Sequence, residues 1–204
     1  MPLTWPYVAS EFFMSCLDMK EYSINKYQLV FIIGRLSYID KNRDDLVETA
    51  FSLNPDYILW LDADAVYPKE LPEKLMEHVD TGKLIVSGIY ARKDNGLPSI
   101  YKFEDNGVRI HAVERNQGII QIDATGLQGV MMHPSIFEIL EEPYFLMRYE
   151  GREYDEGEDI AFYRKCKFND IALWCDTDLY VPHLDLREIP MHTNLKVLSK
   201  IKKL

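Results

Sequence analysis

The first hundred residues alternate between short apolar runs and amphipathic stretches. Continuous apolar runs cover residues 28–33, 57–61 and 84–87, and such runs are typical of strands buried on both faces. The stretches between them, 42–53 and 68–79, place apolar side chains at helical spacing. This order predicts a strand, helix, strand, helix, strand unit whose strands pair in parallel.

The second half of the chain has a different pattern. Residues 99–103, 109–113 and 119–122 are short strand-like segments joined by turns containing Gly or Asn, which predicts an antiparallel meander. A short helix is expected over 134–141 and a last strand over 171–174. The sequence therefore predicts one α/β domain, in which helices flank a mainly parallel sheet and a smaller antiparallel section is added.

The composition fits a single domain and excludes some functions. Of the 204 residues, 47% are hydrophobic and 27% are charged, which is ordinary for a globular protein. The net charge of −10 argues against binding nucleic acid, because phosphate binding normally requires a basic surface. Three cysteines without a C-x-x-C pair indicate neither disulfides nor a zinc site, and they favour a reducing cytoplasm.

Neither end of the sequence is predicted to enter a membrane. The N-terminal segment lacks the positive region of a signal peptide and is interrupted by Pro2, Pro6 and Glu11. No apolar run is long enough to span a bilayer. Residues 195–204 alternate apolar side chains with lysines, and we expect an amphipathic helix that packs on the domain rather than on an anionic membrane surface.

Two carboxylates at the end of a predicted strand give the strongest chemical signal. Asp62 and Asp64 follow the apolar run 57–61 directly, and ligands of open parallel sheets bind beyond the carboxyl ends of the strands. Carboxylates at this spacing can converge on one Mg²⁺ or Mn²⁺, whose remaining ligands are commonly water or substrate phosphates. We therefore expect a divalent cation and a diphosphate at Asp62 and Asp64.

The D-x-D pattern is weak without its context. An acidic surface turn produces it readily, and a second D-x-D at Asp176 and Asp178 is expected to lie in such a loop. The buried run before Asp62 and the proline at position 68 instead indicate a junction between strand and loop, where binding sites are commonly built.

Further candidate residues occur late in the chain. Glu158 and Asp159 are expected to start a helix, and Asp159 is either a catalytic base or a plain helix cap. His183 follows the last predicted strand and is either a metal ligand or a structural histidine. Gly126 lies in a stretch of small residues, which either lets a ligand approach the backbone or forms an ordinary turn.

Taken in order, these segments resemble the small family-2-like glycosyltransferases of GT-A fold. The resemblance covers most of the chain and rests on the motifs at 41–44, 57–64, 85–92, 123–126 and 157–164, followed by His183. It implies a GT-A (Rossmann-like) domain with a nucleotide-sugar-binding half, 1–98, and an acceptor or catalytic half, 99–204. The chain is shorter than typical members, as are minimal versions found in some viruses, for which the location would be the host cytoplasm.

The resemblance also implies roles for individual residues. A divalent metal, Mn²⁺ or Mg²⁺, would be held by Asp64 with help from Asp62, and His183 would be the third ligand. Asp159, with Glu158 beside it, would deprotonate the acceptor hydroxyl in an inverting transfer. The implied donor-binding residues are Arg43, Asp62, Asp64, Arg92 and Gly126.

Three functions remain open from the sequence. The first is a hexosyltransferase-type glycosyltransferase that uses a nucleotide-diphosphate sugar and a glycan, glycoprotein or lipid-linked acceptor. The second is a haloacid-dehalogenase-like phosphatase, because residues 62–66 also fit D-x-D-x-[TV] with Asp62 as the nucleophile, although a strand and a helix precede the motif here. The third is a GT-A-like module that binds carbohydrate without catalysis.

Overall fold

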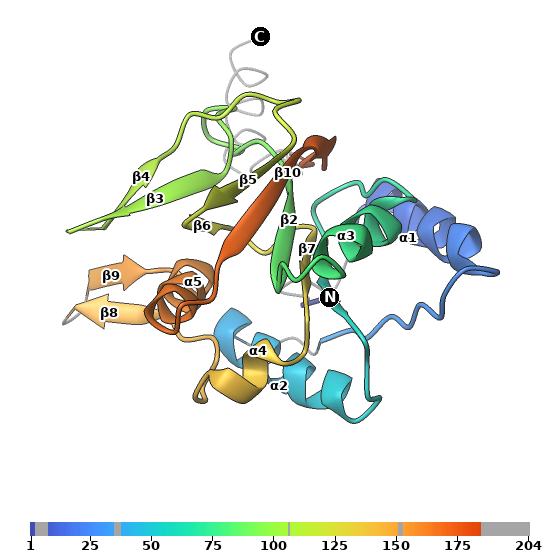
Figure 1. The fold of residues 1–204 in the computed structure, drawn as a ribbon, viewed down its shortest axis with the longest axis horizontal. Helices are drawn as coiled ribbons and strands as arrows, with labels where there is room; N and C mark the ends of the chain where they lie inside the picture. Colours follow the sequence, from blue (N-terminus) through green and yellow to red (C-terminus); the bar gives the residue numbers. More distant parts are fainter. Residues whose placement is uncertain (3–7, 35–37, 106, 151–152, 185–204) are drawn as a thin grey trace, which may run out of the picture.

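The computed structural model describes residues 1–2, 8–34, 38–105, 107–150 and 153–184. Within these residues, a five-stranded mixed sheet carries helices on both faces, and two smaller sheets lie to one side of it (Figure 1). The helices are α1 (Ser10–Ser23), α2 (Ile39–Phe51), α3 (Leu71–Val79), α4 (Ile136–Ile139) and α5 (Glu158–Phe168). The strands are β1 (Ile58–Trp60), β2 (Ile85–Ile89), β3 (Ile100–Glu104), β4 (Gly107–Ile110), β5 (Ile119–Ile122), β6 (Ala124–Thr125), β7 (Val130–Met132), β8 (Arg148–Glu150), β9 (Glu153–Glu156) and β10 (Leu173–Tyr180).

The main sheet has the order β1-β7-β2-β10-β5, and its strand directions are mixed. Only β2 and β10 pair in parallel, whereas β7 runs antiparallel to both β1 and β2 and separates them. The prediction that the early strands pair directly in parallel is therefore wrong. β7 can occupy this central place because its side chains are buried on both faces, with Met131 in one core and Met132 in the other.

The predicted strand 28–33 has no regular secondary structure and is not a strand of the sheet. The backbone oxygen of Ile32 accepts from the Met1 amine, and the Gly34 N–H donates to the Met1 carbonyl. Leu29 and Phe31 pack against a core, whereas Val30 is 53% exposed. The expectation of a strand buried on both faces is therefore wrong for this run, since its apolar content exceeds what the fold covers there.

The sheet separates two hydrophobic cores. Helices α1 and α3 cover one face, and α2, α4 and α5 cover the other (Figure 1). β2 shows why both layers form, because Ile85 lies in one core and its neighbour Val86 in the other. Helix α1 was not anticipated from the sequence, although Phe12, Cys16 and Met19 form its buried face at helical spacing.

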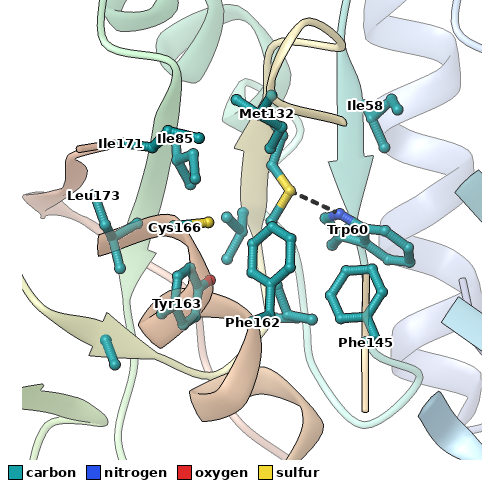
Figure 2. Close-up of a cluster of buried hydrophobic side chains, with 14 of the residues drawn as sticks. Ile58, Trp60, Ile85, Met132, Phe145, Phe162, Tyr163, Cys166, Ile171 and Leu173 are labelled. Carbon is teal, nitrogen blue, oxygen red and sulfur yellow. Dashed lines mark hydrogen bonds between the residues drawn. The ribbon is translucent and has the colours of Figure 1, made fainter. Parts of the chain in front are cut away.

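An aromatic cluster fills the core under α5 (Figure 2). The Phe145 and Phe162 rings stack with centroids 4.6 Å apart, and Trp60 meets Phe145 edge to face at 5.3 Å. The Trp60 indole N–H donates to the sulfur of Met132 over 3.2 Å, so this buried polar atom has a partner. The cluster therefore fixes the end of β1 against α5.

The later part of the chain follows the prediction in its elements more than in their pairing. Helices α4 and α5 and strand β10 form near the expected positions, but β5 joins the main sheet beside β10 instead of continuing the β3–β4 hairpin. The second sheet has the order β4-β3-β6, and the β8–β9 hairpin was not anticipated. The predicted tail helix, 195–204, lies outside the described residues. Among the helices described, none is long and apolar enough to cross a membrane.

The aromatic cluster leads to a test of the core. Phe162→Ala removes a fully buried ring and should lower the free energy of unfolding by about 3–5 kcal/mol. Phe168→Ala, on the same helix at a side chain 88% exposed, should change it by less than about 0.5 kcal/mol. Urea denaturation of both variants measures the difference, and equal losses would contradict this packing.

Candidate functional site

The carboxyl ends of three strands meet at one edge of the main sheet. β1, β2 and β10 run in the same direction, since β2 is parallel to β10 and both β1 and β2 oppose β7. Asp62 and Asp64 follow β1, Tyr90 follows β2, and His183 follows β10. An isolated bridge between Ala65 and His183 joins the first and last of these ends. The sheet thus collects segments from both halves of the chain.

Asp64 and His183 form the first group of the site. His183 Nε2 lies 3.4 Å from Asp64 Oδ2, and His183 Nδ1 lies 3.0 Å from the carbonyl oxygen of Ala91. A carbonyl only accepts, so Nδ1 carries the proton of a neutral ring and Nε2 presents its lone pair toward Asp64. The backbone N–H of Leu184 donates to the Asp64 carbonyl at 2.7 Å and holds the two segments together.

Lys93 is a third member of this group, which the sequence motifs did not indicate. Its Nζ lies 2.5 Å from Asp64 Oδ2. Burial raises the pKa of Asp64, but its contacts with His183 and Lys93 outweigh that effect and lower the pKa to about 2. Asp64 is therefore a firmly ionised carboxylate. The available signal was position, because Lys93 follows the end of β2 just as Asp64 follows β1.

A buried ion-pair network forms the second group. Arg43 is 4% exposed, and its Nη2 donates to Asp62 Oδ1 while its Nε donates to Glu158 Oε1, each at 3.1 Å. Burial lowers the pKa of Arg43, but the two carboxylates prevail and raise it, so the guanidinium stays charged. Its Nη1 is buried and has no hydrogen-bond partner among the described residues. A buried donor without a partner calls for an explanation, such as an ordered water or an atom of a bound ligand.

Helix α2 positions Arg43. Leu46, Val47 and Ala50 form the buried face of this helix, and Arg43 continues the same face one turn toward the helix start. The Arg43 guanidinium also lies over the Trp60 ring, 5.5 Å from its centroid. The apolar pattern that buries one face of α2 therefore also places the charged Arg43 guanidinium at the end of β1.

Asp159 forms the third group, at the start of α5. Gly157 is the N-cap residue, so the plain cap interpretation of Asp159 is wrong; Asp159 lies in the first helical turn and accepts from the Ile160 N–H at 2.7 Å. Burial and the neighbouring Glu158 carboxylate raise the pKa of Asp159 to about 7, although Ile160 and Arg43 act against this shift. Asp159 can therefore exchange a proton near neutral pH.

Gly126 and Tyr90 connect the groups. A Cβ atom at Gly126 would lie 2.1 Å from the Tyr90 hydroxyl and 3.4 Å from Asp159 Oδ2, so only glycine fits between them. The Tyr90 ring meets the His183 ring edge to face with centroids 5.7 Å apart. Tyr90, which the sequence analysis did not single out, thus reaches from the Asp64–His183 pair to the neighbourhood of Asp159.

Two predicted donor or metal residues take other partners. Asp62 pairs with Arg43 rather than with the Asp64–His183 pair, so its role as a metal ligand stays a prediction. In the described part of the chain, the side-chain hydrogen bonds of Arg92 go to Asp94 and the Tyr101 hydroxyl, not to another predicted site residue.

The second D-x-D lies in strand β10 and not in the expected loop. Asp176 Oδ2 lies 3.1 Å from Nε2 of His78, and Asp178 accepts from the Gly118 N–H at 3.0 Å. Both carboxylates therefore make contacts that hold neighbouring elements to β10. This pair does not follow the carboxyl end of a strand, as Asp62 and Asp64 do.

The Asp64–His183 pair fits a divalent cation. The described residues contain no group of three or more His, Cys, Asp or Glu side chains that could hold a metal. Mg²⁺ and Mn²⁺ nevertheless bind through few protein ligands when substrate phosphates and water complete the shell. A carboxylate oxygen and an imidazole nitrogen 3.4 Å apart are ligand types that suit such an ion, and the Lys93 ammonium now pairs with that carboxylate.

Comparisons with known proteins agree with this architecture. Residues 42–135 match the model described as glycosyl transferase family 2, and this segment contains Arg43, Asp62 and Asp64. Among solved structures, a crystal structure of A197 from STIV matches with a TM-score of 0.63 and 17% identity, over 90% of this chain and 82% of that chain. No curated protein sequence matches significantly.

The resemblance to the GT-A glycosyltransferases is confirmed at two levels. The fold is a mixed α/β sheet flanked by helices with a second antiparallel sheet, which is the GT-A class expected from the sequence. The family match over residues 42–135 supports the resemblance to glycosyltransferases of family 2 in this part of the chain. The ion pair between Asp62 and the buried Arg43 guanidinium disfavours the phosphatase, because there the Asp62 carboxylate would need to be free to attack.

The contact between Gly126 and Tyr90 can be tested by a double substitution. Gly126→Ala should lower stability by about 1–3 kcal/mol, because its methyl group overlaps the Tyr90 hydroxyl. Tyr90→Phe removes that hydroxyl, so the double variant should recover at least about 1 kcal/mol relative to the sum of the single changes. Thermal unfolding of all four proteins gives the coupling, and additive losses would contradict the contact.

The raised pKa of Asp159 predicts a pH-dependent stability. The folded state binds this proton more tightly than the unfolded chain does, so stability falls as the pH rises from about 4 to about 7. Asp159→Asn cannot ionise and should exceed the original protein in stability by up to about 4 kcal/mol at pH 8, with no gain near pH 4. Asp45→Asn, on the exposed face of α2, is the matched control. A gain from Asp159→Asn that does not depend on pH would contradict the shift.

Proposed function

We propose that this protein is a metal-dependent glycosyltransferase. It would transfer a sugar from a nucleotide-diphosphate sugar to an acceptor hydroxyl, with inversion at the anomeric carbon. The observation that carries the proposal is the contrast between two aspartates at one edge of the sheet. Asp64 lies 3.4 Å from the His183 imidazole and suits a cation, whereas Asp159 lies beside Glu158 in the first turn of α5, with its pKa raised to about 7, and suits a transferable proton.

The donor would bind along the ends of β1 and β2. Asp64 and His183 would hold Mn²⁺ or Mg²⁺, and this ion would neutralise charge that develops on the departing diphosphate. Arg43 would donate from its free Nη1 to an oxygen of the donor while its other nitrogens keep Asp62 and Glu158 in place. The half formed by residues 1–98 would thus supply most donor contacts.

The acceptor would bind on the side of residues 99–204. Asp159 would accept the proton of the acceptor hydroxyl, and the raised pKa makes this carboxylate a stronger base than an ordinary aspartate. Gly126 lets the Tyr90 hydroxyl lie against the backbone close to Asp159 Oδ2, so Tyr90 would border the place where the acceptor hydroxyl meets Asp159. Arg43 holds the Glu158 carboxylate, so Glu158 would influence Asp159 through its negative charge alone. A glycan, glycoprotein or lipid-linked hydroxyl is the expected acceptor class.

Ligand-induced thermal stabilisation tests the donor site. In the presence of Mn²⁺, one nucleoside diphosphate among UDP, GDP, ADP and CDP should raise the melting temperature by about 5 °C or more, because ligands stabilise the state that binds them. Asp64→Asn should abolish the Mn²⁺-dependent part of this shift. Asp178→Asn, from the second D-x-D, should retain it.

Activity separates the proposal from its rivals. With a donor identified by the screen, Asp159→Asn should lower kcat by at least about 100-fold while donor binding persists. Glycan binding without nucleotide binding would favour the non-catalytic module. Covalent phosphorylation of Asp62 would favour the phosphatase.

A further inference from the structure

Lys93 contacts Asp64, but none of the donor and acceptor roles proposed above involves it. Its ammonium contacts Asp64 Oδ2, the oxygen that also faces His183 Nε2. The Lys93 and Asp64 side chains are 36% and 37% exposed, so the pair is open to solvent and to a ligand. A cation of the protein itself thus lies against the carboxylate that suits a divalent ion.

The turn that carries Lys93 is well braced. Ala91 and Pro98 form an isolated bridge, and the Arg92 N–H donates to the Leu97 carbonyl at 2.8 Å. The Arg92 guanidinium forms an ion pair with Asp94 at 2.6 Å, so the charge of this neighbouring cation is already paired. The backbone on both sides of Lys93 is therefore fixed, while its long side chain extends to Asp64.

We propose that Lys93 is a second cationic group of the donor site, which holds Asp64 in the absence of a divalent cation and pairs with the donor diphosphate when the cation is bound. This inference rests on the proposed function. The ammonium and a divalent ion would repel each other at the Asp64 carboxylate, so the two would compete for it. The flexible lysine stem lets the ammonium move to a phosphate oxygen within its reach.

Charge balance supports this second role. Arg43 is held by Asp62 and Glu158, and Arg92 by Asp94, so neither guanidinium has its full charge available for a phosphate. Lys93 loses its only carboxylate partner in the described residues once a metal ion binds Asp64. Its released charge would then lie beside the incoming diphosphate, where charge-assisted hydrogen bonds are strong.

Calorimetry on the full chain tests the two roles separately. With Mn²⁺ alone, Lys93→Met should bind about two- to fivefold more tightly than the original protein, because a competing surface ion pair is removed. With saturating Mn²⁺, the same variant should bind the nucleoside diphosphate selected from UDP, GDP, ADP and CDP about tenfold more weakly, because a charged hydrogen bond is lost. Lys93→Arg should keep most of the diphosphate affinity.

Lys83→Met is the matched control, since it removes the same charge at the opposite end of β2 and should change neither affinity. Unchanged Mn²⁺ and diphosphate binding by Lys93→Met, with both ligands bound by the original protein, would overturn the inference and leave the proposed function intact. Weaker Mn²⁺ binding by Lys93→Met would also overturn it, because Lys93 would then organise the metal site. Failure of the original protein to bind Mn²⁺ and every nucleoside diphosphate would instead overturn the proposed function and the inference with it.

Discussion

The site depends on the two ion pairs made by the buried guanidinium of Arg43. This guanidinium joins Asp62, at the end of β1, to Glu158, at the start of α5, and it comes from a third element, α2. A charge buried to this extent is tolerated only with its partners, and breaking such a pair typically costs about 3–5 kcal/mol. The relative placement of the D-x-D segment and the Asp159 helix is therefore fixed by charge as well as by the aromatic cluster beneath them.

The same region separates two carboxylates by their surroundings. Asp64 lies at an open edge with a lysine and a histidine, and it stays ionised. Asp159 lies beside Glu158 in a more enclosed place, where its charged form is disfavoured. Tyr90 spans the distance between these environments, packing on His183 and facing Gly126 near Asp159. The stability lost by enclosing Asp159 is offset by the cores on both faces of the sheet.

The fold could be predicted from the sequence where a local pattern decides the structure. Short apolar runs gave β1 and β2, and helical spacing gave α2 and α3 within a few residues of their bounds. The insertion of β7 between β1 and β2 could not be predicted, because strand order depends on contacts between segments some 40 to 70 residues apart. The prediction of a strand over 28–33 was wrong for the same reason, because apolar content does not show whether a partner strand is present.

For the site, the sequence by itself determined the chemistry of the groups and their place at element ends. Asp62, Asp64, Asp159 and His183 were singled out because they lie at such ends, where ligands commonly bind. Only the tertiary structure decided which of them meet, since charges pair through space and not along the chain. In the folded chain, Asp64 contacts both His183 and Lys93, whereas Asp62 pairs with Arg43. The tertiary structure also decided the different ionisation of Asp64 and Asp159, because a pKa shift depends on burial and neighbouring charge that no local pattern encodes.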